Sequence, residues 1–296
     1  MTSPLQHTVN APVRFAGLGV HSGQSVNVTI SPAAVDAGIA FLRTDIADRD
    51  PRIPARADRV VDTRLGTVIA NDDEVRVATI EHLMAAFCGL GVDNAVVCLD
   101  APEMPIMDGS CEPFVKLLDG AGRRPQQARR RFIEILEPIE VTDGDKRAAL
   151  RPAEGFEVAF EIAFEAAVIG RQSIETAIDE DVFRREFADS RTFGFLHEVE
   201  ALRALGLARG GSLDNVVVID GGAVLNPKGL RRPDEFVRHK ALDAIGDLYL
   251  LGAPLIGRYE GTYSGHALNN ALARAVLARP SAWRVASGPV NLARAV

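Results

Sequence analysis

Cysteine and long apolar runs are scarce in this sequence of 296 residues. Three cysteines, Cys88, Cys98 and Cys111, are too scattered for a disulfide framework and fit a reducing compartment. No run approaches the ~18 apolar residues that a membrane-spanning helix needs. The first residues lack a basic segment followed by an apolar stretch, so we expect no signal peptide. These absences together predict a cytoplasmic protein without a transmembrane segment.

The sequence also has fewer basic than acidic residues. The chain carries 33 Lys and Arg against 40 Asp and Glu, so nucleic acid is not an expected partner. Residues 129–131 are the one basic run, which we interpret as part of a solvated linker, although an anionic membrane surface or substrate would also attract it. The overall composition is typical of a folded globular protein, and we expect a monomer.

The patterns that are present predict strands and helices in a repeated order. Each half has several strands, then a helix that bears a histidine, a further strand and a second helix. A glycine-rich turn at 17–23 joins two strands rather than opening a helix, so we interpret it as a hairpin turn and not as a phosphate loop. Strands are predicted over 8–15, 25–30, 38–42, 60–69, 94–100, 132–136, 146–150, 156–164, 174–178, 190–195, 215–219 and 255–259, and helices over 79–87 (with Thr79 as N-cap), 112–118, 181–187, 198–205, 235–251 and 267–278.

The repeated order predicts an α+β protein with two similar domains. We expect the first domain over 1–124 and the second over 132–296, joined by a polar, Arg-rich linker over 125–131. Residues 190–219 form a small β-α-β insert in the second domain. Two related halves can bring their histidine-bearing helices together across one cleft.

The helix predicted over 235–251 carries one histidine and two acids at helical spacing. His239, Asp243 and Asp247 are each four residues apart and therefore share one face. An imidazole and a carboxylate one turn apart suit a metal ion. An ordinary His–Asp pair on a solvated face has the same spacing, so this stretch alone leaves both interpretations open.

The matching helix in the first half supplies a third candidate ligand, His82. Two imidazoles and one carboxylate leave a metal position open for water, which fits zinc in a hydrolase or Fe(II) in an oxygenase. Glu81, directly before His82, is placed to take a proton from that water, a base that an oxygenase does not need. An acid in the first turn also interacts favourably with the helix dipole, which is the alternative for Glu81.

Three further residues are candidates for a role at the same cleft. His266 follows a glycine at the start of the last helix and is a candidate proton donor to a leaving amine. Lys240 is a candidate for binding an anionic group or oxyanion, with a plain surface lysine as the alternative. Asp247 is a candidate for orienting His266 or a ligand. The remaining histidines, interpreted as structural or exposed, are His7, His21 and His197.

Several stretches, in order from about residue 17 to 272, resemble a known family. The most specific are Glu-His-Leu-Met at 81–84, Arg-His-Lys-x-Leu-Asp-x-Ile-Gly-Asp at 238–247 and Ser-Gly-His-Ala-Leu-Asn-Asn at 264–270, and the others lie at 19–23, 89–94, 104–110, 191–195 and 210–215. In these the sequence resembles the zinc-dependent UDP-3-O-acyl-N-acetylglucosamine deacetylases of Gram-negative lipid A synthesis. The resemblance implies two similar α+β domains with paired helices sandwiched between sheets, and the active site at their interface.

The resemblance implies a reaction and the residues that perform it. UDP-3-O-(3-hydroxyacyl)-N-acetylglucosamine would lose its acetyl group to give the free amine and acetate, the committed step of lipid A biosynthesis. Zinc, or alternatively Fe2+, would be held by His82, His239 and Asp243. Glu81 would act as general base and His266 as general acid.

The resemblance also assigns residues to substrate binding. Thr192 would help to hold the oxyanion, Lys240 would bind substrate, and Asp247 would support His266. Phe164 matches an aromatic residue that contacts the nucleotide, and Gly66 replaces a more usual polar or sulfur-containing residue in a loop near the metal. The β-α-β insert would form a tunnel for the acyl chain, lined by Phe193, Phe195, Val199, Gly211, Ser212, Val216 and Val218.

Two functions from other classes compete with a deacetylase. An Fe(II) oxygenase on the same two-His-one-carboxylate set would consume O2 and release no acetate. A non-catalytic lipid- or nucleotide-binding protein would carry the His–Asp pair only as a structural feature. Acetate release from the UDP-sugar, before and after metal removal, separates all three.

Overall fold

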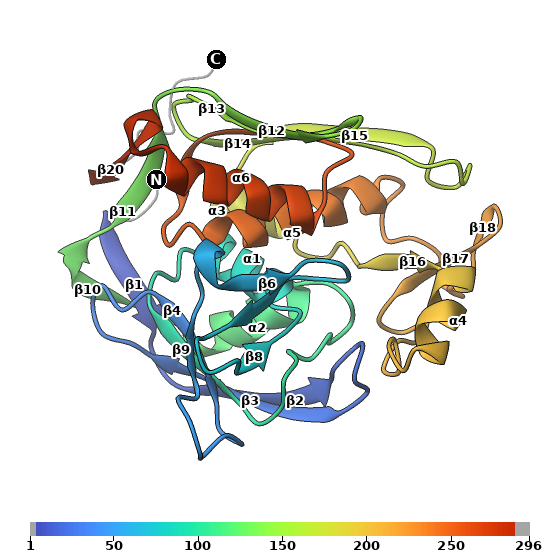
Figure 1. Cartoon of the computed structure of the whole chain (residues 1–296), viewed down its shortest axis with the longest axis horizontal. Coiled ribbons are helices and arrows are strands. Elements are labelled where there is room, and N and C mark those ends of the chain that lie inside the picture. The colour runs from blue at the N-terminus through green and yellow to red at the C-terminus, as the bar shows by residue number, and fades with distance from the viewer. Residues whose placement is uncertain (1–3, 288–296) are drawn as a thin grey trace.

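The computed structural model describes residues 4–287. Residues 1–3, part of the start inspected for a signal peptide, and 288–296, the end of the expected second domain, lie outside the described residues. The chain forms two sheets with helices between them, and a small β-α-β unit projects at one side (Figure 1). The predicted α+β class with helices sandwiched between sheets is confirmed.

The main sheets of the two halves have the same topology. In each, a central strand (β9 or β19) is antiparallel to one neighbour and parallel to the other. The first sheet runs, in spatial order, β2 (Val13–Leu18), β3 (Ser25–Pro32), β9 (Ala95–Leu99), β4 (Ile39–Arg43), β5 (Arg52–Pro54). The second repeats this order with β12 (Ile139–Asp143), β13 (Lys146–Arg151), β19 (Leu255–Thr262), β14 (Phe156–Ala163), β15 (Arg171–Ala177). The repeated element order predicted from the sequence therefore reflects a repeated topology.

The remaining strands extend or flank these sheets. The second sheet is extended by β11 (Arg131–Ile135), parallel to β19, and by β20 (Trp283–Ser287), antiparallel to β11. Strands β12 and β20 were not predicted, because their polar residues hide the period-two pattern. The smaller sheets are β1 (Leu5–Val9) with β10 (Arg123–Arg129); β6 (Val60–Asp62), β7 (Val68–Ala70) and β8 (Arg76–Val77); and β16 (Phe193–Phe195), β17 (Val217–Asp220) and β18 (Ala223–Val224).

Helices α1 (Glu81–Leu90) and α5 (Glu235–Tyr249) pack against each other between the two sheets (Figure 1). Both are buried on almost every side, as expected for helices covered by layers above and below. Gly246 permits the contact, because a Cβ there would lie 2.1 Å from the carbonyl oxygen of Glu81. The other helices are α2 (Glu112–Ala121), α3 (Glu180–Glu186), α4 (Leu196–Ala204), α6 (His266–Ala278) and two short 3-10 helices, η1 (Ala57–Arg59) and η2 (Pro280–Ala282).

Three local predictions in the first half are wrong. The single strand predicted over 8–15 covers the end of β1 and the start of β2, which belong to different sheets. The single strand predicted over 60–69 is two antiparallel strands, β6 and β7, and the chain turns between them. Thr79 is not the N-cap of α1: it lies two residues before the helix with φ +59°, and its hydroxyl faces Glu103 Oε1 at 3.4 Å. Helix α1 has no side-chain cap, so tertiary packing determines where it begins.

The segment predicted as a linker is ordered structure. Residues 125–131 lie in β10, which pairs with β1, and at the start of β11. The basic run is not fully solvated, because Arg130 is buried and its Nε donates to Asp93 Oδ1 at 2.7 Å. The domain boundaries themselves stay a prediction. None of the helices in residues 4–287 is long and apolar enough to cross a membrane.

Candidate metal centre

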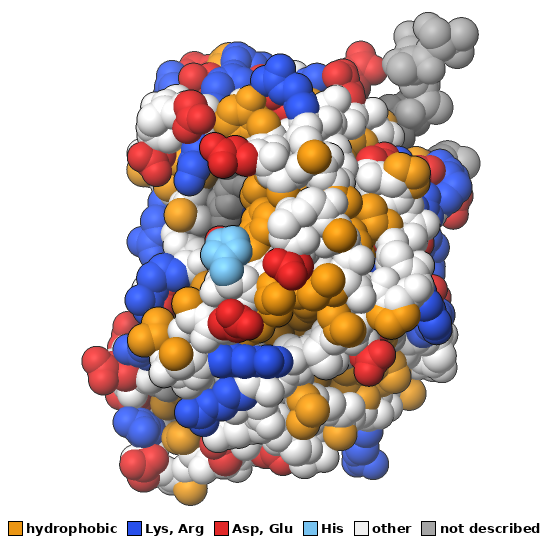
Figure 2. All heavy atoms as spheres, turned by 90° about the vertical axis from the view of Figure 1, so that its right-hand side faces the viewer, with side chains coloured by type: hydrophobic (Ala, Val, Ile, Leu, Met, Phe, Trp, Pro, Cys, Tyr) orange, Lys and Arg blue, Asp and Glu red, His pale blue; other side chains and the backbone are white. Residues whose placement is uncertain are grey.

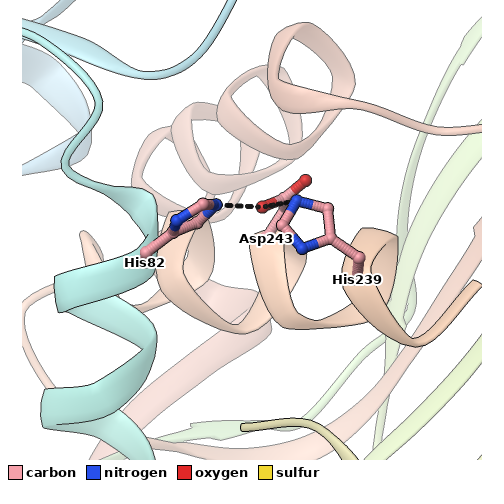
Figure 3. Close-up of side chains that lie close together, drawn as sticks. All are labelled: His82, His239 and Asp243. Atoms are coloured by element: carbon pink, nitrogen blue, oxygen red, sulfur yellow. Dashed lines mark ion pairs between the residues drawn. The ribbon is translucent and has the colours of Figure 1, made fainter. Parts of the chain in front are cut away.

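Three side chains from the two central helices converge on one point. His82 comes from the first turn of α1, and His239 and Asp243 come from α5 (Figure 3). Asp243 Oδ1 lies 3.5 Å from His82 Nε2 and 3.4 Å from His239 Nε2. All three residues are at most 4% exposed, so the alternative of a His–Asp pair on a solvated face is wrong.

The donor set fits a cation. The candidate ligand atoms lie within 4.8 Å of one another, and this is the only such group found in residues 4–287. Asp243 Oδ1 is buried and has no hydrogen-bond partner among those residues, an arrangement that costs ~1–3 kcal/mol unless a cation satisfies it. His239 Nδ1 faces the Ser190 carbonyl oxygen at 3.0 Å. A proton on Nδ1 would donate to that carbonyl and leave the Nε2 lone pair free for a metal.

The electrostatics hold two of these side chains in the forms that metals bind. Burial lowers the pKa of His239 to about 4, so the imidazole is neutral. Burial alone would raise the pKa of Asp243, yet its interactions with His239, His82 and the protonated His266 hold that pKa well below its usual range. Metal ions bind neutral imidazole and ionised carboxylate, so no proton must first be displaced from His239 or Asp243.

Glu81 lies beside this group, at the start of α1. Its side chain is buried, and burial raises its pKa. The Thr67 amide donates to Glu81 Oε2 at 2.9 Å. The turn between β6 and β7 passes close to the carboxylate, since a Cβ on Gly66 would lie 2.7 Å from Glu81 Oε1.

His266 reaches the same group from the first residue of α6. Its Nε2 lies 4.0 Å from Asp243 Oδ2, and its Nδ1 lies 2.9 Å from Asp247 Oδ2. Burial alone would lower the pKa of His266, but the charge and hydrogen bond of Asp247 outweigh it and raise the pKa to about 9. The imidazole is therefore protonated at neutral pH, with Nε2 on the side of the candidate metal site.

A hydrogen-bond network that the sequence analysis missed holds Asp247. Its carboxylate accepts from the Thr67 hydroxyl at 2.5 Å and from Asn269 Nδ2 at 2.9 Å. Asn269 Oδ1 in turn accepts from the hydroxyls of Tyr259 at 2.7 Å and Ser264 at 2.9 Å. Asn269 had a sequence signal, because it lies three residues after His266 on one helix face, and both Ser264 and Asn269 belong to the stretch 264–270 that carries the resemblance.

The segment before β16 is bound to α5 by a buried ion pair and a hydrogen bond. Arg191 and Glu235 form a buried ion pair, with Nε 2.8 Å from Oε1, and the Arg191 amide donates to the same oxygen at 3.0 Å. The Thr192 amide donates to the Gly109 carbonyl at 2.8 Å, which places Thr192 between the two halves of the chain. Thr192 is predictable from the sequence, whereas the buried pair is not, because its partners are 44 residues apart.

Lys240 and the aromatic residues border the same region. The Lys240 ammonium lies 3.6 Å from where a Cβ on Gly265 would stand, next to His266. Phe164 packs against Phe193 and Phe195 with ring centroids 5.7 Å and 6.0 Å apart. Phe193 also lies edge-on to the ring of the candidate ligand His239, at 6.4 Å.

The predicted β-α-β insert is confirmed. Strands β16 and β17 are parallel, and α4 connects them. Figure 2 shows the face of the molecule that carries this insert, where hydrophobic side chains gather between charged ones. The candidate lining residues differ in exposure: Ser212 is exposed, Val218 is buried, and Phe193, Phe195, Val199, Gly211 and Val216 are half-buried.

Comparison with known proteins agrees with the resemblance. The family model for UDP-3-O-acyl N-acetylglycosamine deacetylase matches residues 6–278. A protein of that name from Phenylobacterium zucineum is 66% identical over 98% of this chain and 99% of its own length. Others so named, from Anaeromyxobacter sp. and Shewanella halifaxensis, are each 50% identical, over 96% and 95% of this chain and 92% of their own lengths. The chain therefore belongs to the family of UDP-3-O-acyl-N-acetylglucosamine deacetylases.

Proposed function

We propose that this chain hydrolyses the acetamide of UDP-3-O-(3-hydroxyacyl)-N-acetylglucosamine, giving the free amine and acetate in lipid A biosynthesis. Its membership of the deacetylase family supports this reaction. The observation that carries the mechanism is the convergence of His82, His239 and Asp243 around a buried, unpartnered carboxylate oxygen. An oxygenase on the same three residues is not favoured, because the family is one of hydrolases.

Zinc is the cofactor that we propose for this group. Two imidazoles and a carboxylate match catalytic zinc sites, in which a further position is left for water or substrate. Fe(II) accepts the same donors, so the metal content of the purified protein decides between the two ions. When bound, the metal supplies a Lewis acid that lowers the pKa of water and polarises the acetyl carbonyl.

Glu81 acts as the general base in this proposal. Its carboxylate accepts a proton from the attacking water, and its raised pKa makes it a stronger base than an exposed glutamate. The hydrogen bond from the Thr67 amide fixes Oε2, so the side chain is held beside the ligands without being one of them.

His266 acts as the general acid. The proton on Nε2 passes to the leaving amine, while Asp247 accepts the hydrogen bond from Nδ1, which keeps the ring protonated and oriented before the transfer. Thr192 helps to hold the negative charge that develops on the acetyl oxygen, and Lys240 binds the substrate beside it. The roles of Glu81, His266 and Asp247 are supported by their contacts beside the candidate ligands, and those of Thr192 and Lys240 by the family resemblance.

The acyl chain lies along the insert in this proposal, because the insert's first strand begins against His239. Phe164, placed against the aromatic residues of β16, contacts the nucleotide. We also propose a cytoplasmic monomer, since three free cysteines fit a reducing compartment. The residues that we propose to line the acyl tunnel are Phe193, Phe195, Val199, Gly211, Ser212, Val216 and Val218.

Release of acetate by the Glu81→Ala variant tests the reaction. Glu81 is not among the candidate ligands, so the variant should keep its metal and lose most turnover, by a factor of ~100 or more, typical of losing a general base. Metal content by atomic absorption and acetate release are measured on the same sample. Normal turnover by this variant would reject the role of Glu81, and loss of the metal would make Glu81 a ligand instead.

A further inference from the structure

The proposed acyl-binding insert packs on its own half of the chain through β16, whose Phe193 lies against Phe164 and Phe236. Its three strands form a sheet separate from both main sheets. Helix α4 buries none of its residues, so it contributes little to a core. Contacts with the first half of the chain therefore help to fix the position of α4 and the loop that follows it.

One such contact is made by the glycine-rich turn of the first half. The Gly210 amide donates to the Val20 carbonyl at 3.0 Å, and the Arg209 amide donates to the His21 carbonyl at 3.2 Å. A Cβ on Gly210 would lie 2.2 Å from the Gly19 carbonyl oxygen. The two backbones approach too closely for any side chain at position 210, and we call residues 19–23 the seat of the insert.

The seat is also held by a buried acid of the first half, Glu103. The buried carboxylate of Glu103 accepts from the amides of His21 at 2.8 Å and Ser22 at 2.9 Å. Its Oε1 also accepts from the Thr79 hydroxyl at 3.4 Å, two residues before α1. Glu103 thus connects the seat to the segment that leads into α1, the helix that carries His82.

A second turn of the first half supports the same loop. A Cβ on Gly109 would lie 2.0 Å from the Asn215 carbonyl oxygen, so these backbones also touch. The Asn215 side chain is buried, donates to the Gly210 carbonyl at 3.0 Å and accepts from the Ser212 amide at 2.8 Å. Asn215 thus joins the loop on the seat to the insert's second strand.

We propose that the contact of Gly210 with the seat determines acyl-chain specificity, because it fixes the position of the insert relative to the first half of the chain. The proposal rests on the proposed function, in which the insert binds the acyl chain. The candidate ligands, Glu81 and His266 lie on α1, α5 and α6, outside the insert. Thr192 is held separately, because its amide donates to the Gly109 carbonyl of the first half. Gly210 is therefore a positioning residue for the acyl chain, and its substitution should not move the reacting groups.

Gly210→Ala tests this contact, with Gly222→Ala as the matched control, since a Cβ at 222 meets no atom within 4 Å. Acetate release is measured on a long-chain 3-hydroxyacyl substrate and on its 3-O-acetyl counterpart. Loss of one or two backbone hydrogen bonds predicts a fall of about tenfold in the long-to-short ratio of kcat/KM for Gly210→Ala. Gly222→Ala should keep the wild-type ratio, and an equal fall on both substrates, or no fall, would overturn the proposal.

Hydrogen exchange tests whether the seat holds the insert in place, independently of whether the insert binds the acyl chain. Backbone amides of residues 196–220 should exchange faster in Gly210→Ala than in Gly222→Ala, while α1 and α5 keep wild-type protection and metal content is unchanged. Unchanged exchange in Gly210→Ala would reject only the claim that the contact with the seat holds the insert in place. A wild-type protein without preference for the long chain would overturn the acyl role of the insert, whatever the exchange shows.

Discussion

Replacing Asp247 by Asn changes one charge beside His266 and almost nothing in shape. In the wild type the carboxylate accepts from His266 Nδ1, from the Thr67 hydroxyl and from Asn269. This charge outweighs burial and raises the pKa of His266 to about 9. In Asp247→Asn the opposing effect of burial remains, so the pKa of His266 should fall from about 9 towards its ordinary 6.5.

The size and sign of the change in free energy of unfolding follow from the linkage between protonation of His266 and folding. A change from about 9 to 6.5 corresponds to about 3 kcal/mol, at about 1.36 kcal/mol for each pKa unit. Because the folded-state pKa is raised, the stabilisation is fully present below pH 6.5 and is lost as pH rises through about 9. Wild type and Asp247→Asn should therefore differ most in free energy of unfolding near pH 6, and progressively less above pH 9.

The assay is an NMR titration of the histidine ring nitrogens in metal-free protein, since a bound dication would itself lower the pKa of His266. His266→Gln assigns the resonance. Urea denaturation from pH 6 to 10 supplies the stability difference. If His266 titrates at the same pH in Asp247→Asn and wild type, Asp247 does not hold the proton on His266, and the assignment of the general acid loses its basis.

Two other changes probe the framework around the site. Glu235→Ala leaves the buried guanidinium of Arg191 without its partner and should lower the free energy of unfolding by ~3–5 kcal/mol in urea, whereas a loss under ~1 kcal/mol would contradict a buried pair. Gly246→Ala should destabilise by ~1–3 kcal/mol and weaken metal binding, because its Cβ meets the Glu81 carbonyl at 2.1 Å. Gly120→Ala in α2, where a Cβ meets nothing within 4 Å, should instead stabilise by ~0.5–1 kcal/mol; equal effects of the two alanines would refute the close helix contact.

Local spacing was enough to predict part of the site. His239, Asp243 and Asp247 share one face of α5 because they are four residues apart, and that periodicity is readable without a structure. The matching helix with Glu81 and His82 followed from the repeated order of elements. The common strand topology of the two sheets explains why that repeat placed the two helices against each other.

Contacts between distant segments could not be predicted in the same way. Thr67 reaches Asp247 across 180 residues because the chain turns between β6 and β7, where the apolar pattern suggested one unbroken strand. Thr79 resembles a helix N-cap in sequence, but its hydroxyl faces Glu103, the acid that accepts from the amides of the seat. In both cases tertiary packing overrode a local preference.

Acetate release from UDP-3-O-(3-hydroxyacyl)-N-acetylglucosamine, measured before metal removal, after chelation and after zinc is returned, tests the central claim most directly. The proposed group of His82, His239 and Asp243 predicts that turnover disappears with the metal and returns in proportion to one zinc per chain. His82→Ala and Asp243→Asn should hold less metal than wild type under the same conditions. Full turnover by the metal-free protein would contradict the account.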